Sequence, residues 1–503
     1  MKNLRQLQIF FQKPFLSLHE LKNSGIALEE KTFVSVGGGI GSFCWVDILR
    51  VHGAALSSIA VVAQNRLPYQ QFKQYCDHSG LSPEDRLRSD SGARPDNFWG
   101  FPGYAVSEFF DDLRTLQWRA AAKTIWQIFA EPLAADFYTP TAGRLYASMA
   151  REGQRIGWAS MVRQGTALFL RKLNDGRFAV FYQEPTKKVQ IVVASFVHLA
   201  LGHAIRRSAY PVASPSARVL SGYELDEDFF RTVEETASSV VVVGRGIVAA
   251  RIVERLLPGD HPCPNRTVVS LFRQPLTSAI DPENIQQASL DGWRLQFFNW
   301  PRSTFAGQLT ETLQSATPRA RQQLAKTWSA ASTPPRKQWL RTLKKAYAAQ
   351  TYQSIYGQIA RIDQHDARLA ITLTPDANTD GNEQTLAADY LIDCSGFDDR
   401  LAHHFLYADL IKTYELGVTG IGTLRVNNYF EIEALASEWG SVFVTGNGAA
   451  GNHYGPVDSF WGHQYAALQA IEKLADLPWT KVRKLTAASS LVGWLQWALN
   501  RPI

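Results

Sequence analysis

Short β-prone runs that lead into glycine-rich turns recur along the chain. The first run, residues 32–36, is followed by glycines between positions 37 and 41 and then by an apolar stretch, residues 43–52, that predicts a helix. A second β-prone run, residues 58–63, completes a strand–helix–strand unit of about 30 residues. This order predicts two parallel strands joined by a helix.

The same pattern repeats near the middle of the chain. Residues 239–243 form a β-prone run, a glycine-rich turn and a helix through residue 257 follow, and residues 267–272 predict the next strand. Between the two units, apolar segments separated by turns predict an antiparallel meander at residues 167–171, 177–182 and 190–194.

The rest of the chain also alternates between helical and β-prone segments. We expect helices over residues 303–350, with a break at residues 332–335, and a last helix over residues 458–475 after a glycine-rich turn. Residues 376–386 are polar and acidic and predict a surface loop. Further strands are predicted at residues 357–372, 389–393 and 441–445.

These elements predict an α/β fold with two Rossmann-like nucleotide-binding domains of three layers (β/β/α), the second inserted in the first. The predicted parts are an N-terminal segment 1–30, the first domain 31–225, the inserted domain with a helical insertion 226–388, the return of the first domain 389–476, and a basic amphipathic C-terminal segment 477–503.

The first glycine-rich turn carries a dinucleotide-binding fingerprint. Gly37, Gly39 and Ser42 occupy the key positions of GxGxxG/A/S, and Gly41 lies between them. Glycine lets the backbone approach a diphosphate, and the N-terminus of the next helix faces that charge with free N–H groups. A ribose-binding carboxylate is expected about 20 residues further on. The chain has Gln64 there, which can bind a ribose hydroxyl as a neutral amide.

The second glycine-rich turn has Gly244, Gly246 and Ala249 in the pattern GxGxxA. Arg273 follows the next predicted strand, in the position where an acid would select NAD. A guanidinium can bind a 2′-phosphate through two hydrogen bonds, whereas an acid would repel it. Arg273 therefore favours NADPH over NADH; the other interpretation is an ordinary surface residue at a strand end.

With two fingerprints, a meander between them and a late strand followed by Gly446 and Asn447, the chain resembles the flavoproteins with two dinucleotide-binding domains. Residues 194–202 and 391–397 are similar to the ATG-like crossings of that family. The resemblance implies FAD in the first domain, NAD(P)H in the second, and contact of Gly446 and Asn447 with the ribityl chain, where the family has an acid in place of Asn447. The chain looks most like class B flavin monooxygenases, especially amine N-hydroxylases, but lacks their FxGxxxHxxx(W/Y) signature.

Polar residues before the last helix are candidates for chemistry. The resemblance implies that this helix points its N-terminus at the flavin, with Asp458 or Ser459 as its N-cap. Asn452, His453 and Asp458 are the predicted catalytic residues, and His453 can exchange a proton with a reactant. A packing role is the other interpretation of His453.

A loop rich in arginine and aspartate precedes an aromatic cluster at residues 85–104. We expect Arg88 and Asn97 in this loop to contact the phosphates of FAD or a polar substrate. A surface loop whose charges pair with one another is the other interpretation.

Composition narrows the function classes. The chain has 503 residues, a formal net charge of +6 and four scattered cysteines without a CxxC pair. These features argue against nucleic-acid binding, a metal site and a disulfide reductase. No signal-peptide pattern or membrane-spanning run is present, so we expect a cytoplasmic protein. Both ends combine basic and apolar residues, which predicts either contact with the inner face of a membrane or docking on the protein itself.

Together these features predict an FAD-dependent oxidoreductase that uses NADPH, of the monooxygenase type, acting on a small organic molecule. A peripheral membrane NAD(P)H:quinone reductase is the first alternative, favoured by the basic ends. A flavin-binding protein without turnover is the second, because amides replace acids at Gln64 and Asn447.

Overall fold

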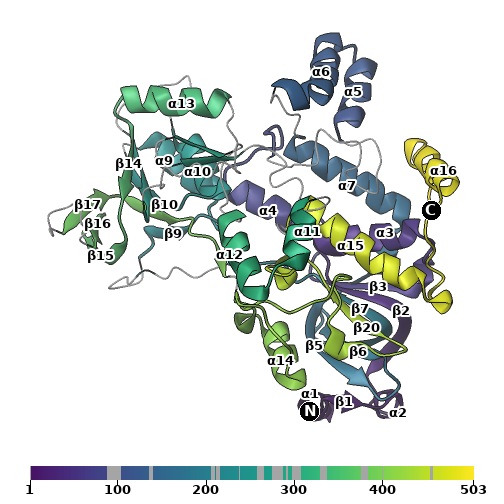
Figure 1. Cartoon of the computed structure of the whole chain (residues 1–503). Coiled ribbons are helices and arrows are strands. Elements are labelled where there is room, and N and C mark those ends of the chain that lie inside the picture. The colour runs from purple at the N-terminus through teal and green to yellow at the C-terminus, as the bar shows by residue number, and fades with distance from the viewer. Residues whose placement is uncertain are drawn as a thin grey trace.

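The computed structural model describes residues 2–87, 104–134, 140–205, 210, 216–236, 238–257, 266–274, 287–290, 293–296, 308–328, 337–374, 383–398, 400–453 and 457–503. The described chain forms two main sheets that lie apart, each with helices packed against it (Figure 1). The predicted Arg88 and Asn97 lie outside the described residues.

The first main sheet is built around two long neighbouring strands. β2 (Ala27–Gly37) pairs in parallel with β3 (Ile59–Ala63) on one side and with β7 (Val189–Leu199) on the other. β20 (Ser441–Val444) pairs in parallel with the second half of β7. The carboxyl ends of β2, β7 and β20 therefore meet at one edge, where both predicted flavin turns begin.

The predicted antiparallel meander is confirmed. β5 (Thr166–Leu173) pairs with β6 (Phe178–Gln183), and β6 pairs with the first half of β7. β1 (Phe15–Leu16) and β4 (Val162–Gln164) extend the same sheet at its edges. Because β7 belongs to the meander and to the parallel strands, it ties the two layers together.

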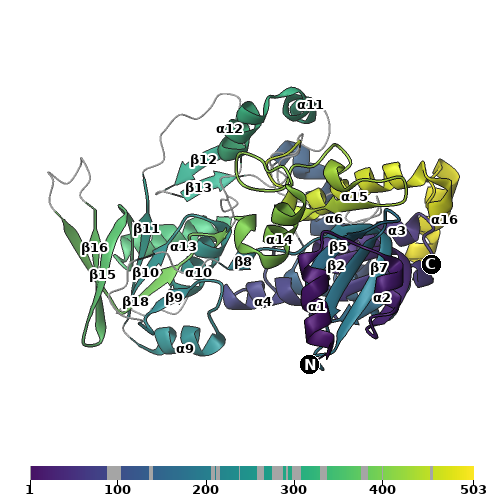
Figure 2. The same ribbon diagram turned by 90° about the horizontal axis from the view of Figure 1, so that it is seen from below.

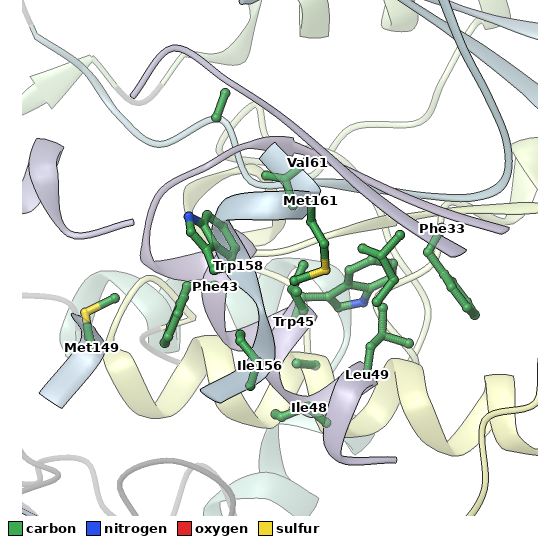
Figure 3. Close-up of a cluster of buried hydrophobic side chains, with 14 of the residues drawn as sticks. Phe33, Phe43, Trp45, Ile48, Leu49, Val61, Met149, Ile156, Trp158 and Met161 are labelled. Carbon is green, nitrogen blue, oxygen red and sulfur yellow. The ribbon is translucent and has the colours of Figure 1, made fainter. Parts of the chain in front are cut away.

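One face of this sheet is covered by α3 (Ile40–Val51), α7 (Ala142–Ile156) and α15 (Phe460–Ala475) (Figure 1). α3 is buried along nearly its whole length, because apolar side chains occupy several of its faces. Phe43 and Trp45 of α3 lie in a core with Phe33 and Trp158 (Figure 3).

The second main sheet is parallel throughout, in the order β14 (Tyr352–Tyr356), β11 (Thr267–Phe272), β10 (Ser239–Val243), β18 (Tyr390–Asp393) and β9 (Val219–Ser221). α10 (Ile247–Leu256) follows β10 through the second glycine turn and packs on this sheet with α9 (Glu227–Glu235) and α13 (Lys337–Ala348). The second strand–turn–helix unit is therefore confirmed. β9 and β18 lie just outside residues 226–388, and the predicted domain boundaries stay a prediction.

A three-stranded antiparallel sheet covers the other face: β15 (Ile359–His365), β16 (Arg368–Leu373) and β17 (Gln384–Ala388). The predicted loop at residues 376–386 was wrong at its end, because β17 begins at Gln384. Leu386 pairs with Ile371 of β16, and this non-local partner outweighs the polar local sequence.

The chain crosses between the two main sheets near residues 203 and 396. There β8 (Ala204–Ile205) and β19 (Phe397–Asp398) pair with each other in antiparallel orientation. These strands directly follow the two segments that resemble family crossings.

Smaller helices surround these sheets (Figure 2). The described bounds are α1 (Lys2–Gln12), α2 (Leu18–Lys22), α4 (Gln70–His78), α5 (Tyr104–Arg114), α6 (Trp118–Ala134), α8 (Trp158–Met161), α11 (Gln308–Ser315), α12 (Pro318–Trp328), α14 (Phe405–Tyr414) and α16 (Ala487–Ala498), with a hairpin of β12 (Gln287–Leu290) and β13 (Trp293–Gln296). Among the helices described, none has both the length and the hydrophobicity to span a bilayer.

Candidate nucleotide sites and active site

The first glycine turn, between β2 and α3, is closed tightly by its surroundings. Gly37 and Gly38 have φ of +136° and +78°, which side chains rarely adopt. A Cβ at Gly37 would lie 2.0 Å from the carbonyl oxygen of Ala200, and one at Gly38 would lie 2.1 Å from Cβ of Ala63. Only glycine fits at either position.

Gly39 differs from its two neighbours, because a Cβ there would meet nothing within 4 Å. It is the N-cap of α3 and has no side chain to cap the helix. The N-terminus of α3 thus opens onto space beside the turn, with its N–H groups and the positive end of its dipole. This arrangement can bind an anionic group such as a diphosphate.

Ser42 stabilises the turn by a hydrogen bond, and Gly41 allows α15 to pack closely against it. Ser42 Oγ accepts a hydrogen bond of 3.0 Å from the Gly38 N–H and so holds the turn closed. At Gly41 a Cβ would lie 2.9 Å from Nδ1 of His463 on α15, so a glycine is needed for this close approach. Both residues shape the site rather than face the open space at Gly39.

Gln64 follows β3 at the same edge of the sheet. Its Nε2 donates a hydrogen bond of 3.2 Å to Thr166 Oγ1, and its carbonyl oxygen accepts one from Gln164 Nε2. The residue is exposed. An exposed amide therefore stands where the fingerprint expects a ribose-binding acid.

Gly446 and Asn447 begin the short turn after β20. Gly446 has φ +68°, and a Cβ there would lie 2.9 Å from Cε1 of His463. His463 is therefore wedged between the first glycine turn and this last one. Sequence reasoning missed His463, because a single histidine in the first turn of a helix forms no motif.

The His463 ring sits in a group of charged and polar side chains. Burial lowers the pKa of His463 to about 4; the charge of Asp458 opposes this shift and His203 adds to it. His463 Nδ1 is shielded and has no hydrogen-bond partner among the described residues. Asp458 itself is exposed, with Oδ2 3.6 Å from His203 Nε2, and Ser459 is the N-cap of α15.

A buried polar chain lies directly behind these turns. His198 Nδ1 is 2.8 Å from Ser35 Oγ and its Nε2 is 3.0 Å from Thr445 Oγ1, so one imidazole links β2, β7 and the end of β20. The ring stacks on Trp45 at 4.8 Å between centroids. Burial lowers the pKa of His198 well below its usual value, and His463 adds to the shift. A neutral His198 thus fixes the strands that carry both turns.

The second glycine turn opens into a cavity of about 380 Å³. Gly244 has φ +121°, and a Cβ there would lie 2.4 Å from the carbonyl oxygen of Cys394. Gly246 is the N-cap of α10, and Ala249 is buried against the sheet. Like Gly39 in the first turn, Gly246 is an N-cap without a side chain, and the cavity begins at the neighbouring Gly244 and Arg245.

Two arginines line this second cavity. Arg273 follows β11 and is exposed, as expected for a residue that meets a ligand. Arg245, between the two glycines, places its guanidinium 4.8 Å over the Phe272 ring and donates to the carbonyl oxygen of Gln274. Arg245 was missed, although it is the variable residue of the GxG motif. Together the two residues make this cavity strongly cationic.

A larger cavity of about 730 Å³ lies between α12 and the loops after α14. His453 lines it with Arg321 and Gln322 of α12 and with Arg425 and Glu433. Burial lowers the pKa of His453 below 6.5, and the charge of Arg321 lowers it further, while Glu433 opposes the shift. The lowered pKa keeps the ring neutral near pH 7, and its Nδ1 is shielded and has no hydrogen-bond partner among the described residues.

Asn452 also reaches this cavity, but its amide serves the loop. Its Oδ1 accepts a hydrogen bond from the Val426 N–H, and its Nδ2 donates to the carbonyl oxygens of Leu424 and Ala449 at 2.8 and 2.9 Å. The side chain therefore links the segment at Leu424 and Val426 to the segment at Ala449. Its predicted catalytic role stays a prediction.

No protein-family model matches the chain, and no curated protein matches its sequence. Solved structures match over almost its whole length. The ornithine N-hydroxylase of Kutzneria sp. 744, solved with reduced FAD, NADP⁺ and L-ornithine, is 13% identical with a TM-score of 0.64, over 89% of this chain and 99% of that one. The cadaverine monooxygenase of Erwinia amylovora, bound to FAD, is 12% identical with a TM-score of 0.65, over 91% and 96%.

The bacillithiol disulfide reductase of Bacillus cereus also matches, at 12% identity and a TM-score of 0.50, over 88% of this chain and 100% of that one. The chain has the two-Rossmann-domain fold of these flavoproteins. The predicted fold class is confirmed. Because the neighbours run different reactions on one fold, the reaction must be argued from the residues.

Proposed function

We propose that the protein is an FAD-dependent oxidoreductase that takes electrons from NADPH and hydroxylates a small amine. One observation carries this proposal: each main sheet ends in a glycine turn before a helix, with open space at Gly39 in the first turn and a cavity along Gly244 and Arg245 in the second. The amine class is supported by the likeness to ornithine and cadaverine hydroxylases.

FAD fits the first sheet. The open side of Gly39 and the N-terminus of α3 would receive its diphosphate, which a side chain at Gly39 would obstruct. The amide of Gln64 would bind the adenosine ribose, and Asn447 would bind the ribityl chain as a neutral group. An amide can still form a hydrogen bond with a hydroxyl group. Each contact is therefore weaker than with the acid of the family, but it is not lost.

NADPH fits the second sheet. The backbone at Gly244 and Gly246 and the N-terminus of α10 would receive its diphosphate. Arg273 and Arg245 supply two guanidinium groups in the same cavity, which suits the extra phosphate of NADPH and gives no advantage to NADH.

Reduced FAD, when bound, would supply the activation of oxygen. His453 is the residue of this chain best placed to handle the proton of the substrate. An alkylamine is protonated at neutral pH, with a pKa of about 10.4, and it must lose that proton before its nitrogen can be hydroxylated. The neutral imidazole of His453 faces the larger cavity and can accept the proton there.

The test is an NADPH oxidation assay of the FAD-loaded protein with a panel of small amines, followed by mass spectrometry of the products. A product heavier by one oxygen atom supports the proposal. If the protein passes electrons to quinones and yields no oxygenated amine in the presence of oxygen, the quinone reductase would replace the proposed monooxygenase. A bound flavin that NADPH never reduces would support the other alternative, a flavin-binding protein without turnover.

His453→Gln tests the assigned proton acceptor. We expect turnover to fall about 100-fold, while FAD content and the rate of flavin reduction by NADPH stay unchanged. The exposed His403→Gln serves as the matched control and should leave both rates as they are. Equal turnover in the His453 variant would remove this residue from the reaction.

A further inference from the structure

The two ends of the chain combine basic and apolar residues, yet they fold differently. α1 packs two phenylalanines on the protein: Phe10 is 3% exposed, and Phe11 contacts Phe169 and Phe405 at 5.4 and 5.9 Å between ring centroids. The N-terminal helix therefore docks on the meander. At the other end α16 leaves large apolar side chains in solvent.

The large apolar side chains that α16 and its C-cap Leu499 leave exposed share one side of the helix, and we call them the α16 apolar face. They are Leu491 (60% exposed), Val492 (54%), Trp494 (36%), Leu495 (47%) and Leu499 (62%). Leu491, Leu495 and Leu499 are spaced by four positions, so they form a stripe along the helix. Single exposed apolar residues are ordinary, whereas a contiguous stripe marks an interaction surface.

The charged side chains that flank α16 along the sequence, from residue 477 on, are all cations. No charged residue occurs within α16, and the last acid of the chain is Asp476. Exposed cations flank the helix on both sides: Lys481, Arg483, Lys484 and Arg501. Only Lys484 among them pairs with that acid, at 3.0 Å.

The helix is held firmly in this position. Thr486 and Ser489 form a capping box at its start. Near its end, Arg151 donates to the carbonyl oxygen of Trp497 at 2.8 Å and to Asn500 Oδ1 at 3.2 Å, and its guanidinium lies 5.0 Å over the Trp497 ring. α16 lies at the outer edge of the molecule, away from α1 (Figure 1 and Figure 2). The protein thus presents a preformed apolar face.

We propose that the α16 apolar face lies in the interface of a membrane that contains anionic lipids. Leucine and tryptophan side chains would enter the boundary between headgroups and acyl chains, and the flanking cations would meet the negative headgroups. With 12 residues, α16 lies on the membrane and does not cross it. A second copy is the less suitable occupant, because a symmetric contact would bring the cations of one copy against those of the other.

The experiment is co-sedimentation of the full chain with vesicles. Vesicles that mix phosphatidylcholine with phosphatidylglycerol should bind the protein, and vesicles of phosphatidylcholine alone should bind it at least about tenfold more weakly. Binding should weaken as salt is added. Tryptophan fluorescence should shift to shorter wavelength on binding, because Trp494 leaves water.

The double variant Leu491→Glu/Leu495→Glu should lose vesicle binding. Both side chains are exposed, so the fold and the FAD content should be unchanged. Ile9→Glu on α1, 47% exposed, is the matched control and should bind like the unchanged protein. The inference is independent of the proposed reaction, since NADPH oxidation is measured separately.

Three results would overturn this assignment: no binding to anionic vesicles, equal binding of the double variant, or a dimer in solution that the double variant converts to a monomer.

Discussion

The two glycine turns follow one sequence pattern but differ in what surrounds them. The first is packed closely at Gly37 and Gly38, where a Cβ would clash with Ala200 and Ala63; it is open at Gly39, and His463 lies beside it. The second opens into a cavity of about 380 Å³ lined by Arg245 and Arg273. A shared fingerprint therefore specifies the backbone geometry of the turn. The residues packed around each turn determine how a ligand can reach it.

This difference suits two cofactors with different exchange rates. A nucleotide held at the enclosed first turn, against the polar chain through His198, would be retained through many turnovers. A nucleotide at the second turn would meet the exposed Arg273 and the half-buried Arg245, and it would bind and leave in each cycle. We infer that the first turn stores a prosthetic group and that the second admits a cosubstrate.

The largest expected effect comes from Gly37→Ala. The new Cβ would lie 2.0 Å from a backbone oxygen, in a conformation with φ +136°, so the turn must shift. We expect the free energy of unfolding to fall by about 3 kcal/mol or more, with loss of FAD binding. Thermal denaturation and flavin absorbance measure the two effects.

Gly39→Ala is the matched control for that change. Its φ of −86° suits alanine, and the added Cβ meets nothing within 4 Å. Stability should fall by only about 0.5–1 kcal/mol, because alanine is a poorer N-cap than glycine, while FAD affinity falls because the methyl group occupies the space for the diphosphate. If Gly39→Ala binds FAD normally, the cradle lies elsewhere.

Arg273→Ala sharpens the comparison at the second turn. A charge-assisted hydrogen bond to phosphate contributes about 1.5–3 kcal/mol, so the Michaelis constant for NADPH should rise about 10- to 100-fold. That for NADH should barely change. Steady-state kinetics with both nucleotides measure the ratio.

Arg245→Ala should move the same ratio in the same direction, because Arg245 lines the same cavity. Arg361→Ala, on β15 and 62% exposed at the side chain, provides the control. Equal losses for NADPH and NADH at Arg273 would contradict the assignment of the 2′-phosphate.

The last expected effect is a pH dependence of stability at the first turn. The pKa of His463 is about 4 in the folded protein and about 6.5 when unfolded. Above pH 6.5 the residue is neutral in both states. As the pH falls from 6.5 to 4, the unfolded chain takes up the proton first, so the free energy of unfolding decreases, by at most about 3 kcal/mol.

His463→Asn should flatten this part of the stability profile, measured by denaturant unfolding at several pH values. The exposed His365→Asn should leave the profile unchanged. A profile of the same slope in the His463 variant would show that another group titrates there.

Local patterns predicted much of the fold. Strand β11 was predicted with its observed bounds, and both strand–turn–helix units were found, because glycine and hydrophobic spacing act within a few residues. The N-cap of α15 was predicted as Asp458 or Ser459, and Ser459 fills this position. Helix α7 was not predicted, although Thr141 caps it and glycine ends it.

The site was less predictable, because its contacts join distant parts of the chain. Ser35 and His198 are 163 positions apart, and no local pattern signals that hydrogen bond. His463 gains its role only where two turns converge. Asn452 was expected to be catalytic from its position beside His453, but its hydrogen bonds to Leu424, Val426 and Ala449 give it a structural task.

The central claim is that the enclosed turn holds FAD and the open turn brings NADPH to it. An anaerobic titration of the purified protein by absorbance tests both halves at once. We predict a yellow protein whose flavin absorbance is bleached by an equimolar amount of NADPH and far more slowly by NADH. A colourless protein that takes up no added FAD, or a bound flavin that stays oxidised in excess NADPH, would contradict the account.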